Sequence, residues 1–224
     1  VRRQGKPGKL QVFKNTPSGH QQLLKLLRQS QVERVCLEAT GIYHLDLSLA
    51  LSKEPGLALM VLNPKVARRF AEALSERQKT DKVDALVLAE YAERMPFVPW
   101  QPPRGEVLAL RALARRLLAL VEQRTQAKNH LHAAEASTHT PSIVVEDITL
   151  TIQQLEVQIQ TLHQAVLELI AQHENLAHTL ALLTSIKGVA EVSAIKLMGE
   201  LLVLPESMTA KQWVAMAGLD PRHH

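Results

Sequence analysis

The sequence predicts a protein of the α/β plus α class: an α/β domain, then a long helical hairpin, then a small helical region. Three observations carry this prediction. Short apolar runs alternate with helical patterns over residues 1–95, four prolines crowd residues 96–103, and apolar residues at heptad spacing extend from 148 to 183. The length of 224 residues allows one or two domains.

Strand and helix patterns alternate along residues 1–95, as a parallel sheet with crossover helices requires. Apolar and β-branched runs predict strands at 9–15, 34–39 and 57–62. Helices are expected to begin at Ser18 or Gly19 and at Thr40, and to cover 65–75 and 81–94. We therefore assign residues 1–95 to one domain.

The proline-rich segment 96–105 predicts a linker, and residues 106–183 are expected to form coiled-coil helices. Within them a heptad seam is formed by Ile148, Ile152, Leu155, Ile159, Leu162, Val166, Leu169, His173, Leu176, Leu180 and Leu183. Such a seam needs a covering partner, either helix 106–135 in an antiparallel hairpin or another protomer. His173 interrupts the apolar pattern, as a tolerated polar residue or as a metal ligand.

Residues 184–224 form the third predicted part. Ser185 to Ala190, with Gly188 among them, separate two helical patterns, and a further helix is expected at 209–216. Helix, glycine turn and helix resemble a helix-hairpin-helix, in which backbone N–H groups of the turn contact DNA phosphate. Lys187 and Gly188 are thus candidate nucleic-acid contacts. The alternative is a helical corner in which Gly188 is the residue just past the helix end.

The formal charge of +4 and the pI near 9.3 arise mainly from the start of the chain. Eight basic residues stand against Glu33 alone within residues 1–35. Such a run attracts polyanions, which makes Arg2, Arg3, Lys6 and Lys9 candidate nucleic-acid contacts. A solvated basic face is the alternative interpretation.

Composition excludes several other classes of protein. Cys36 is the one cysteine, which excludes an intramolecular disulfide or a multi-cysteine zinc site and fits a reducing compartment. No apolar run approaches the ~18 residues of a membrane span. Aromatic residues make up only 3%, which argues against a stacking platform for single-stranded nucleic acid.

Three carboxylates stand where a metal site would form. Glu38 ends a predicted buried strand, and ligands bind at that edge of open α/β sheets. Asp81 and Asp84 share one face of the first turn of a predicted helix, beside Lys79 and Lys82, which would attract phosphate. Carboxylates converging from these two elements would bind Mg²⁺ and support phosphodiester cleavage. As the alternative, both aspartates only cap the helix or interact with its dipole.

These residues belong to motifs that occur together in one family. They are EATGIY from Glu38, LNP at 62–64, KTDKVDA from Lys79, IKGV at 186–189 and AMAGLDP at 215–221. In this order the motifs resemble the DEDD transposases of insertion-sequence family one-ten, the bridge-RNA-guided recombinases. The resemblance extends over nearly the whole chain, and its most specific part is the pair EATGIY and KTDKVDA.

The resemblance implies a ribonuclease-H-type, RuvC-like domain, a coiled coil, and a second domain with a helix-hairpin-helix-like segment and a catalytic serine. Glu38, Asp81 and Asp84 would match the second, third and fourth acidic residues of the family and would hold Mg²⁺. The implied partners are DNA, a structured non-coding guide RNA and further copies of the chain, joined through the coiled coil. The implied location is the bacterial cytoplasm, at the nucleoid.

Two family features have no counterpart in this sequence. No aspartate precedes Asp46, so the first acidic residue and its central strand are missing, and the sequence stops three residues after Pro221, before the expected serine. We therefore expect the full-length parent to cut and rejoin DNA, and this chain to bind nucleic acid without strand transfer. We also expect a marginally stable sheet with an open edge.

Two other functions fit the same residues. One is a RuvC-like nuclease or resolvase that cuts branched DNA without RNA or serine chemistry. The other is a non-enzymatic coiled-coil protein that binds nucleic acid, in which Glu38, Asp81 and Asp84 are caps and surface charges.

Overall fold

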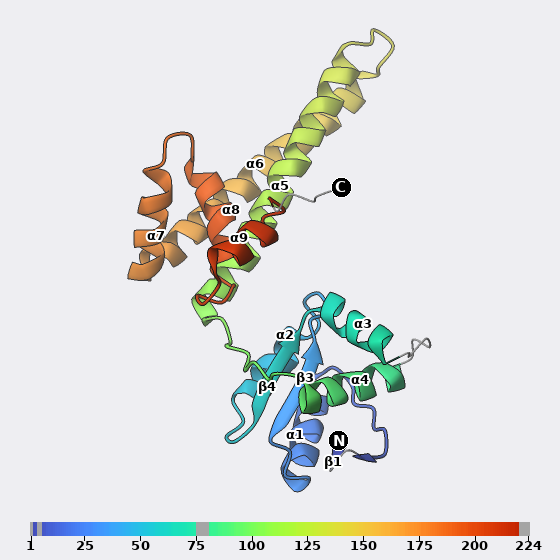
Figure 1. The fold of residues 1–224 in the computed structure, drawn as a ribbon. Coiled ribbons are helices and arrows are strands. Elements are labelled where there is room, and N and C mark those ends of the chain that lie inside the picture. The colour runs from blue at the N-terminus through green and yellow to red at the C-terminus, as the bar shows by residue number, and fades with distance from the viewer. Residues whose placement is uncertain (1, 4–5, 75–80, 220–224) are drawn as a thin grey trace, which may run out of the picture. The chain divides into compact units, whose positions relative to one another are not determined.

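The computed structural model describes residues 2–3, 6–74 and 81–219, which form two compact units (Figure 1). The first unit covers residues 1–102 and the second residues 103–224. The division falls between Pro102 and Pro103, within the proline-rich segment. Among the described residues, no helix is both long and apolar enough to cross a membrane.

The first unit is a small α/β structure. Its helices and strands are β1 (Arg2–Arg3), β2 (Lys6–Pro7), α1 (Pro17–Gln29), β3 (Arg34–Glu38), α2 (Leu45–Ser52), β4 (Ala58–Leu62), α3 (Pro64–Ala73) and α4 (Asp81–Arg94). β1 and β2 make a minimal antiparallel pair. β3 and β4 pair in parallel, with Arg34 opposite Ala58 and Glu38 opposite Leu62. The helix α2 is the crossover between them, as a parallel pair requires.

One face of the β3–β4 pair is covered by apolar side chains from α1 and α2. Leu24 and Leu27 of α1 and Leu51 of α2 are buried against Leu59, and Val35 and Leu37 join this cluster. Since side chains alternate across a strand, Cys36 and Glu38 of β3 emerge on the opposite face. α4 packs against β3 and contributes no residue to the cluster, which is consistent with a position on that second face.

The two edges of this small sheet differ. At the β4 edge, the Trp100 N–H donates to the Leu59 carbonyl at 2.6 Å, so the proline-rich segment covers that strand. The bonds from Ala58 N–H to the Glu33 carbonyl and from Ala39 N–H to the Leu62 carbonyl fix the register of β3. The backbone groups of alternate β3 residues, from Arg34 to Glu38, then face the other edge. Among the described residues no strand pairs with that edge.

The predicted strand at 9–15 is wrong. The chain at 8–14 has no regular structure, and Val12 is 87% exposed. A strand must pair its backbone groups with a neighbour, and none of the described strands pairs with this segment. Instead the chain turns at Thr16, whose side chain caps α1 by accepting from the Gly19 N–H. A Cβ on Gly19 would collide with the Lys14 carbonyl, so the segment lies directly on the start of α1.

The helix expected from Thr40 begins later, at Leu45. Residues 41–44 form turns. Gly41 has φ 52°, a backbone conformation that residues with a Cβ rarely adopt. Ile42 is 70% exposed rather than directed into the core. The helices predicted at 65–75 and 81–94 correspond to α3 and α4, and the strands predicted at 34–39 and 57–62 correspond to β3 and β4.

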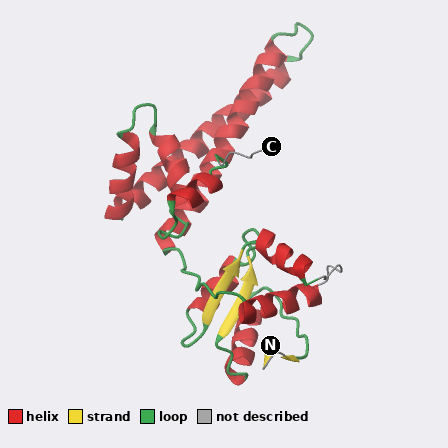
Figure 2. Ribbon diagram, in the orientation of Figure 1, coloured by secondary structure: helices red, strands yellow, loops and turns green. Residues whose placement is uncertain are grey.

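The second unit is entirely helical in its described part (Figure 2). Its helices are α5 (Gly105–Glu135), α6 (Ser142–Ala171), α7 (Glu174–Thr184), α8 (Glu191–Leu201) and α9 (Ala210–Met216). α5 and α6 pack along each other as a long antiparallel hairpin (Figure 1). Of the two partners considered for the heptad seam, the hairpin partner is therefore the one observed for α6.

The core of this unit lies where α7 and α8 pack against the base of the hairpin. Leu110, Val166, Leu176, Ile195 and Met198 are at most 1% exposed and belong to one cluster. α8 approaches α5 closely: a Cβ on Gly199 would lie 2.9 Å from the Ala114 Cβ. Glu200 on the same helix accepts two hydrogen bonds from Arg115, at 2.6 and 2.9 Å. Small residues and an ion pair thus fix α8 on α5.

The residues of the predicted heptad seam are divided between two helices, α6 and α7. α6 ends at Ala171, and His173 has extended backbone angles, φ −132° and ψ 106°, as the N-cap of α7. The break lets α7 turn back so that Leu176 is fully buried against Val166 and Ile195. A helix that continued straight would carry Leu176 away from this core. His173 therefore marks a helix boundary.

Partial burial lowers the reactivity of Cys36 in the folded chain. Burial raises the pKa of the Cys36 thiol to about 11 from its ordinary value of 9.0. Because only the thiolate is nucleophilic, we expect alkylation near pH 8 to be roughly 100-fold slower in the folded than in the unfolded chain. Timed iodoacetamide labelling with mass spectrometry checks this, and equal labelling rates with and without urea would contradict it.

Candidate active site

Glu38 lies at the carboxyl end of β3, directly opposite Leu62, the last residue of β4. It is half-buried, on the face of the strand pair opposite Val35 and Leu37. Both strands end at this edge, and the chain leaves it through the 39–44 turn and through α3. The carboxyl edge of a parallel sheet is where open α/β folds bind their ligands.

The second predicted element of the site is α4, and this helix packs against the same strand. Asp84 is in the first turn of α4 and is half-buried. α4 begins at Asp81, but the side chains of Asp81 and Lys82 lie outside the part of the structure that is described. Lys79 belongs to the segment 75–80, which also lies outside it. The structure thus places β3 against α4 but leaves the predicted carboxylate trio untested.

The donor set suits a hard divalent cation. Glu38 and Asp84 supply carboxylate oxygens, which Mg²⁺ prefers. Within the described residues no three His, Cys, Asp or Glu side chains come together as a metal site. The predicted third ligand, Asp81, is outside that search, so Glu38 and Asp84 are the two candidate ligands that can be placed.

A chain of polar contacts anchors the turn after Glu38, and sequence reasoning missed it. The Asn15 Nδ2 donates to the Tyr43 carbonyl at 2.8 Å, and the Asn15 Oδ1 lies 2.7 Å from the Nε2 of His20, which is buried. Because that oxygen can only accept, the His20 Nε2 carries the proton. This chain ties α1 to the 39–44 turn. It joins residues far apart in the sequence, so no local pattern indicated it.

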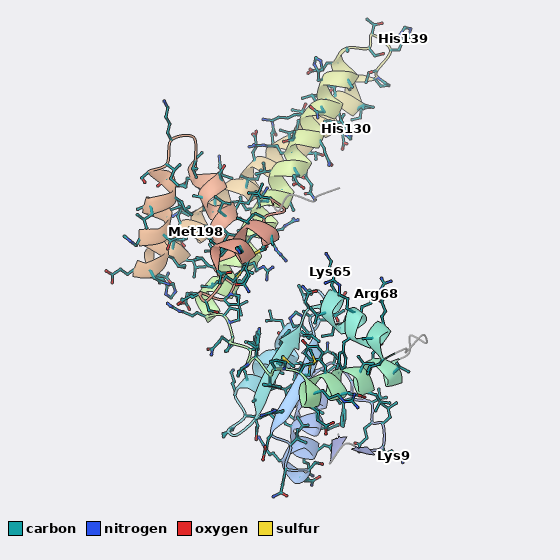
Figure 3. All side chains as sticks on the ribbon, viewed as in Figure 1. Lys9, Lys65, Arg68, His130, His139 and Met198 are labelled. Carbon is teal, nitrogen blue, oxygen red and sulfur yellow. The ribbon has the colours of Figure 1, made fainter. Side chains whose placement is uncertain are left out.

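The predicted nucleic-acid contacts lie in both units. In the first unit Lys9 is exposed (Figure 3), whereas for Arg2, Arg3 and Lys6 only the backbone, in β1 and β2, is described. In the second unit the exposed Lys187 lies in the turn between α7 and α8.

The turn between α7 and α8 has the form that the sequence predicts. Gly188 has φ 94°, and the Val189 N–H donates to the Ile186 carbonyl at 3.0 Å. Ala190, the N-cap of α8, makes no side-chain capping bond, which leaves the first N–H groups of α8 without a cap. The Glu191 carboxylate is held beside α6 by the His163 Nε2 at 2.8 Å. This geometry fits both a phosphate-binding hairpin and a helical corner.

Comparison with known proteins identifies the family. The family model for DEDD transposases of the IS110 type, described as "Transposase", matches residues 1–140. A pilin gene-inverting protein of Moraxella bovis is 28% identical over 219 residues, covering 95% of this chain and 65% of that protein. A pilin gene-inverting protein of Moraxella lacunata is 30% identical over 194 residues, covering 84% and 56%. The chain thus spans roughly three fifths of the length of these relatives.

The matched region contains the EATGIY and KTDKVDA motifs and, in the structure, the whole first unit together with α5. The resemblance stated from the motifs is therefore confirmed by the family match: this chain belongs to the DEDD transposases of the IS110 type.

Proposed function

We propose that this chain provides the acidic site and part of the DNA-binding surface of a recombinase that cuts and rejoins DNA strands. The observation that carries the proposal is the family match over residues 1–140, which includes both acidic motifs. Transposition and the inversion named for the Moraxella proteins both require strand exchange, so either outcome fits this chemistry. The proposed parts are the RuvC-like domain 1–95, the linker 96–105, the coiled coil 106–183 and the C-terminal region 184–224.

In the proposed site, Glu38, Asp81 and Asp84 hold Mg²⁺ beside the scissile phosphate. A bound Mg²⁺ supplies Lewis-acid stabilisation of the charge that develops on the phosphate oxygens. Glu38 on β3 and Asp84 in the first turn of α4 would hold the ion, and α4 packs against β3. The anchored turn after Glu38 holds the end of β3 in place. We infer a ribonuclease-H-type arrangement from this placement and the family.

The proposed DNA contacts are Arg2, Arg3, Lys6, Lys9, Lys79 and Lys82 near the first unit, and Lys187 with Gly188 at the turn before α8. For the turn, the support is the uncapped N-terminus of α8 and the left-handed Gly188. A structured guide RNA that selects the DNA is proposed on the family resemblance alone.

Self-association through the hairpin is proposed from an apolar stripe on the outer face of α6. Ile143, Leu150 and Val157 recur every seven residues and are 67%, 53% and 63% exposed. A surface recess runs between Leu150 and Val157, and Gln153, Gln154 and Gln158 complete its lining. Heptad spacing is the pattern of helix pairing. Uncharged glutamines flank Leu150 and Val157, whereas Glu146 and Asp147 lie between Ile143 and Leu150.

We expect the change Leu150→Glu to separate the copies, because it places one charge from each chain in the shared stripe. Leu182→Glu, at a similarly exposed leucine on α7, is the matched control and is expected to leave the assembly intact. Light scattering coupled to size-exclusion chromatography measures the mass of each variant. An unchanged mass for Leu150→Glu would remove α6 as the interface.

The proposed function is tested by a recombination assay with the full-length gene product. A plasmid carrying the element's flanking DNA is incubated with the protein, with Mg²⁺ or with EDTA, and junctions are amplified and sequenced. We expect new joints with Mg²⁺ only. Cleavage of branched DNA without rejoining would indicate a resolvase, and DNA binding without any metal-dependent cut would indicate a non-enzymatic protein. Prior treatment with ribonuclease tests the guide RNA.

A further inference from the structure

The outer face of α3 is basic, and none of the contacts considered above uses it. Asn63 caps this helix by accepting from the Lys65 N–H at 2.9 Å, and Pro64 occupies its first turn. The inner face packs on α4, where the ring of Phe70 meets Tyr91 edge to face at 5.0 Å. The outer face carries the exposed cations Lys65, Arg68 and Arg69 (Figure 3 labels Lys65 and Arg68).

These cations are only partly neutralised. Arg68 is 82% exposed on its side chain and pairs with Glu72 at 2.9 Å, one helical turn away. Lys65 and Arg69 make no ion pair with another residue of the described chain, and they are four residues apart, so they lie side by side on the helix. The N-terminal end of α3 adds the positive end of its dipole. The face therefore carries an excess of positive charge.

The position of this basic face in the fold distinguishes it from an ordinary solvated surface. β4 ends at Leu62, which is opposite Glu38, and α3 begins two residues later at Pro64. The cations thus start at the same sheet edge as the proposed acidic site. A phosphodiester chain that approaches acidic side chains is repelled by them, and positive charge at that edge offsets the repulsion.

From this placement we infer that Lys65 and Arg69 bind the phosphate backbone of the DNA strand that runs to the Glu38 edge. The ion pair with Glu72 neutralises the charge of Arg68, so we assign no phosphate contact to Arg68. The inference rests on the proposed function for its ligand, but it assigns that ligand to residues outside the family motifs. Both residues act by positioning DNA, and neither takes part in the reaction.

The test is DNA binding by the full-length gene product, measured by fluorescence anisotropy of a labelled duplex over a series of salt concentrations. For Lys65→Gln/Arg69→Gln, loss of two phosphate contacts is expected to reduce the slope of log affinity against log salt by about 1.8. At 0.1 M salt this corresponds to roughly 60-fold weaker binding. Lys25→Gln/Lys53→Gln removes the same charge from exposed lysines on α1 and after α2, and is expected to change the slope little.

A second variant predicts the opposite sign. Glu72→Gln releases Arg68 from its ion pair, so the salt slope is expected to steepen by up to about 0.9. Thermal melts check that all variants remain folded. We expect them to be folded, because every substituted residue is exposed. The same slope in wild type and Lys65→Gln/Arg69→Gln would overturn the inference while leaving the proposed function standing. A loss confined to labelled RNA, with duplex binding unchanged, would also overturn it. Absence of DNA binding by the wild type would overturn both.

Discussion

Replacing Glu38 by glutamine is expected to lower strand exchange by the full-length gene product roughly 100-fold or more, without unfolding the protein. The substitution keeps the size of the side chain and removes the charge that would hold Mg²⁺. Changes that only reorient metal ligands already cost about 10–100-fold in affinity or activity, and loss of a ligand should cost at least as much. Counting recombinant junctions by quantitative amplification measures the effect.

The matched control is Glu33→Gln. Glu33 is exposed, it directly precedes β3, and it lies at the other end of the same strand. It is expected to retain wild-type activity, while Asp84→Asn, in the first turn of α4, is expected to fall with Glu38→Gln. If Glu38→Gln retained more than about a tenth of the wild-type junctions, the assignment of Glu38 as a metal ligand would fail.

Truncating Leu176 to alanine is expected to destabilise the helical unit by about 2–5 kcal/mol. Leu176 is fully buried in the cluster with Val166, Leu110 and Ile195, so its truncation would leave a cavity in the core. A typical domain is stable by only ~5–15 kcal/mol, so this one change removes a large share. Urea unfolding of the chain, followed by circular dichroism, measures it as a lower midpoint.

Leu182→Ala is the comparison within the same helix. Leu182 is 55% exposed on α7, so truncation there is expected to change the free energy of unfolding by less than about 0.5 kcal/mol. Both variants remove the same side-chain atoms from a leucine of α7, and the two leucines differ in burial. Equal changes in the free energy of unfolding for the two variants would mean that α7 does not pack into this core. The helix break at His173 would then not serve to bury Leu176.

The parts predicted well from sequence are those whose signals are local. Apolar runs bounded by turn residues placed β3 and β4, and caps such as Asn63-Pro64 placed α3. The segment 9–15 has the same kind of local pattern, yet it forms no strand, because a strand exists only beside a partner and the described chain offers none. The break at His173 was hidden because Leu176, Leu180 and Leu183 keep the heptad spacing through it.

In the candidate site, too, the features with a local sequence signal could be predicted and those that depend on tertiary contacts could not. Glu38 at a strand end and Asp84 in a helix start could be predicted, because both positions follow from the order of elements along the chain. The link from His20 through Asn15 to the Tyr43 carbonyl could not, since it depends on how α1 lies against a turn more than twenty residues away. The basic face of α3 had a sequence signal, cations at steps of three and four, but only the fold places it at the Glu38 edge.

The length of the α5–α6 hairpin determines how far its tip lies from the core of the helical unit. From Leu110 in the core to the turn near Ser137, α5 extends about 40 Å at 1.5 Å per residue, which exceeds one turn of B-DNA at roughly 34–36 Å. In a symmetric pair joined through Ile143, Leu150 and Val157, the hairpins would fix the separation of the two cores. Adding one heptad to each helix of the hairpin would move each core by about 10 Å, the rise of roughly three base pairs. If two copies pair in this way, the hairpin length of this chain would set the interval between the two DNA segments that they hold.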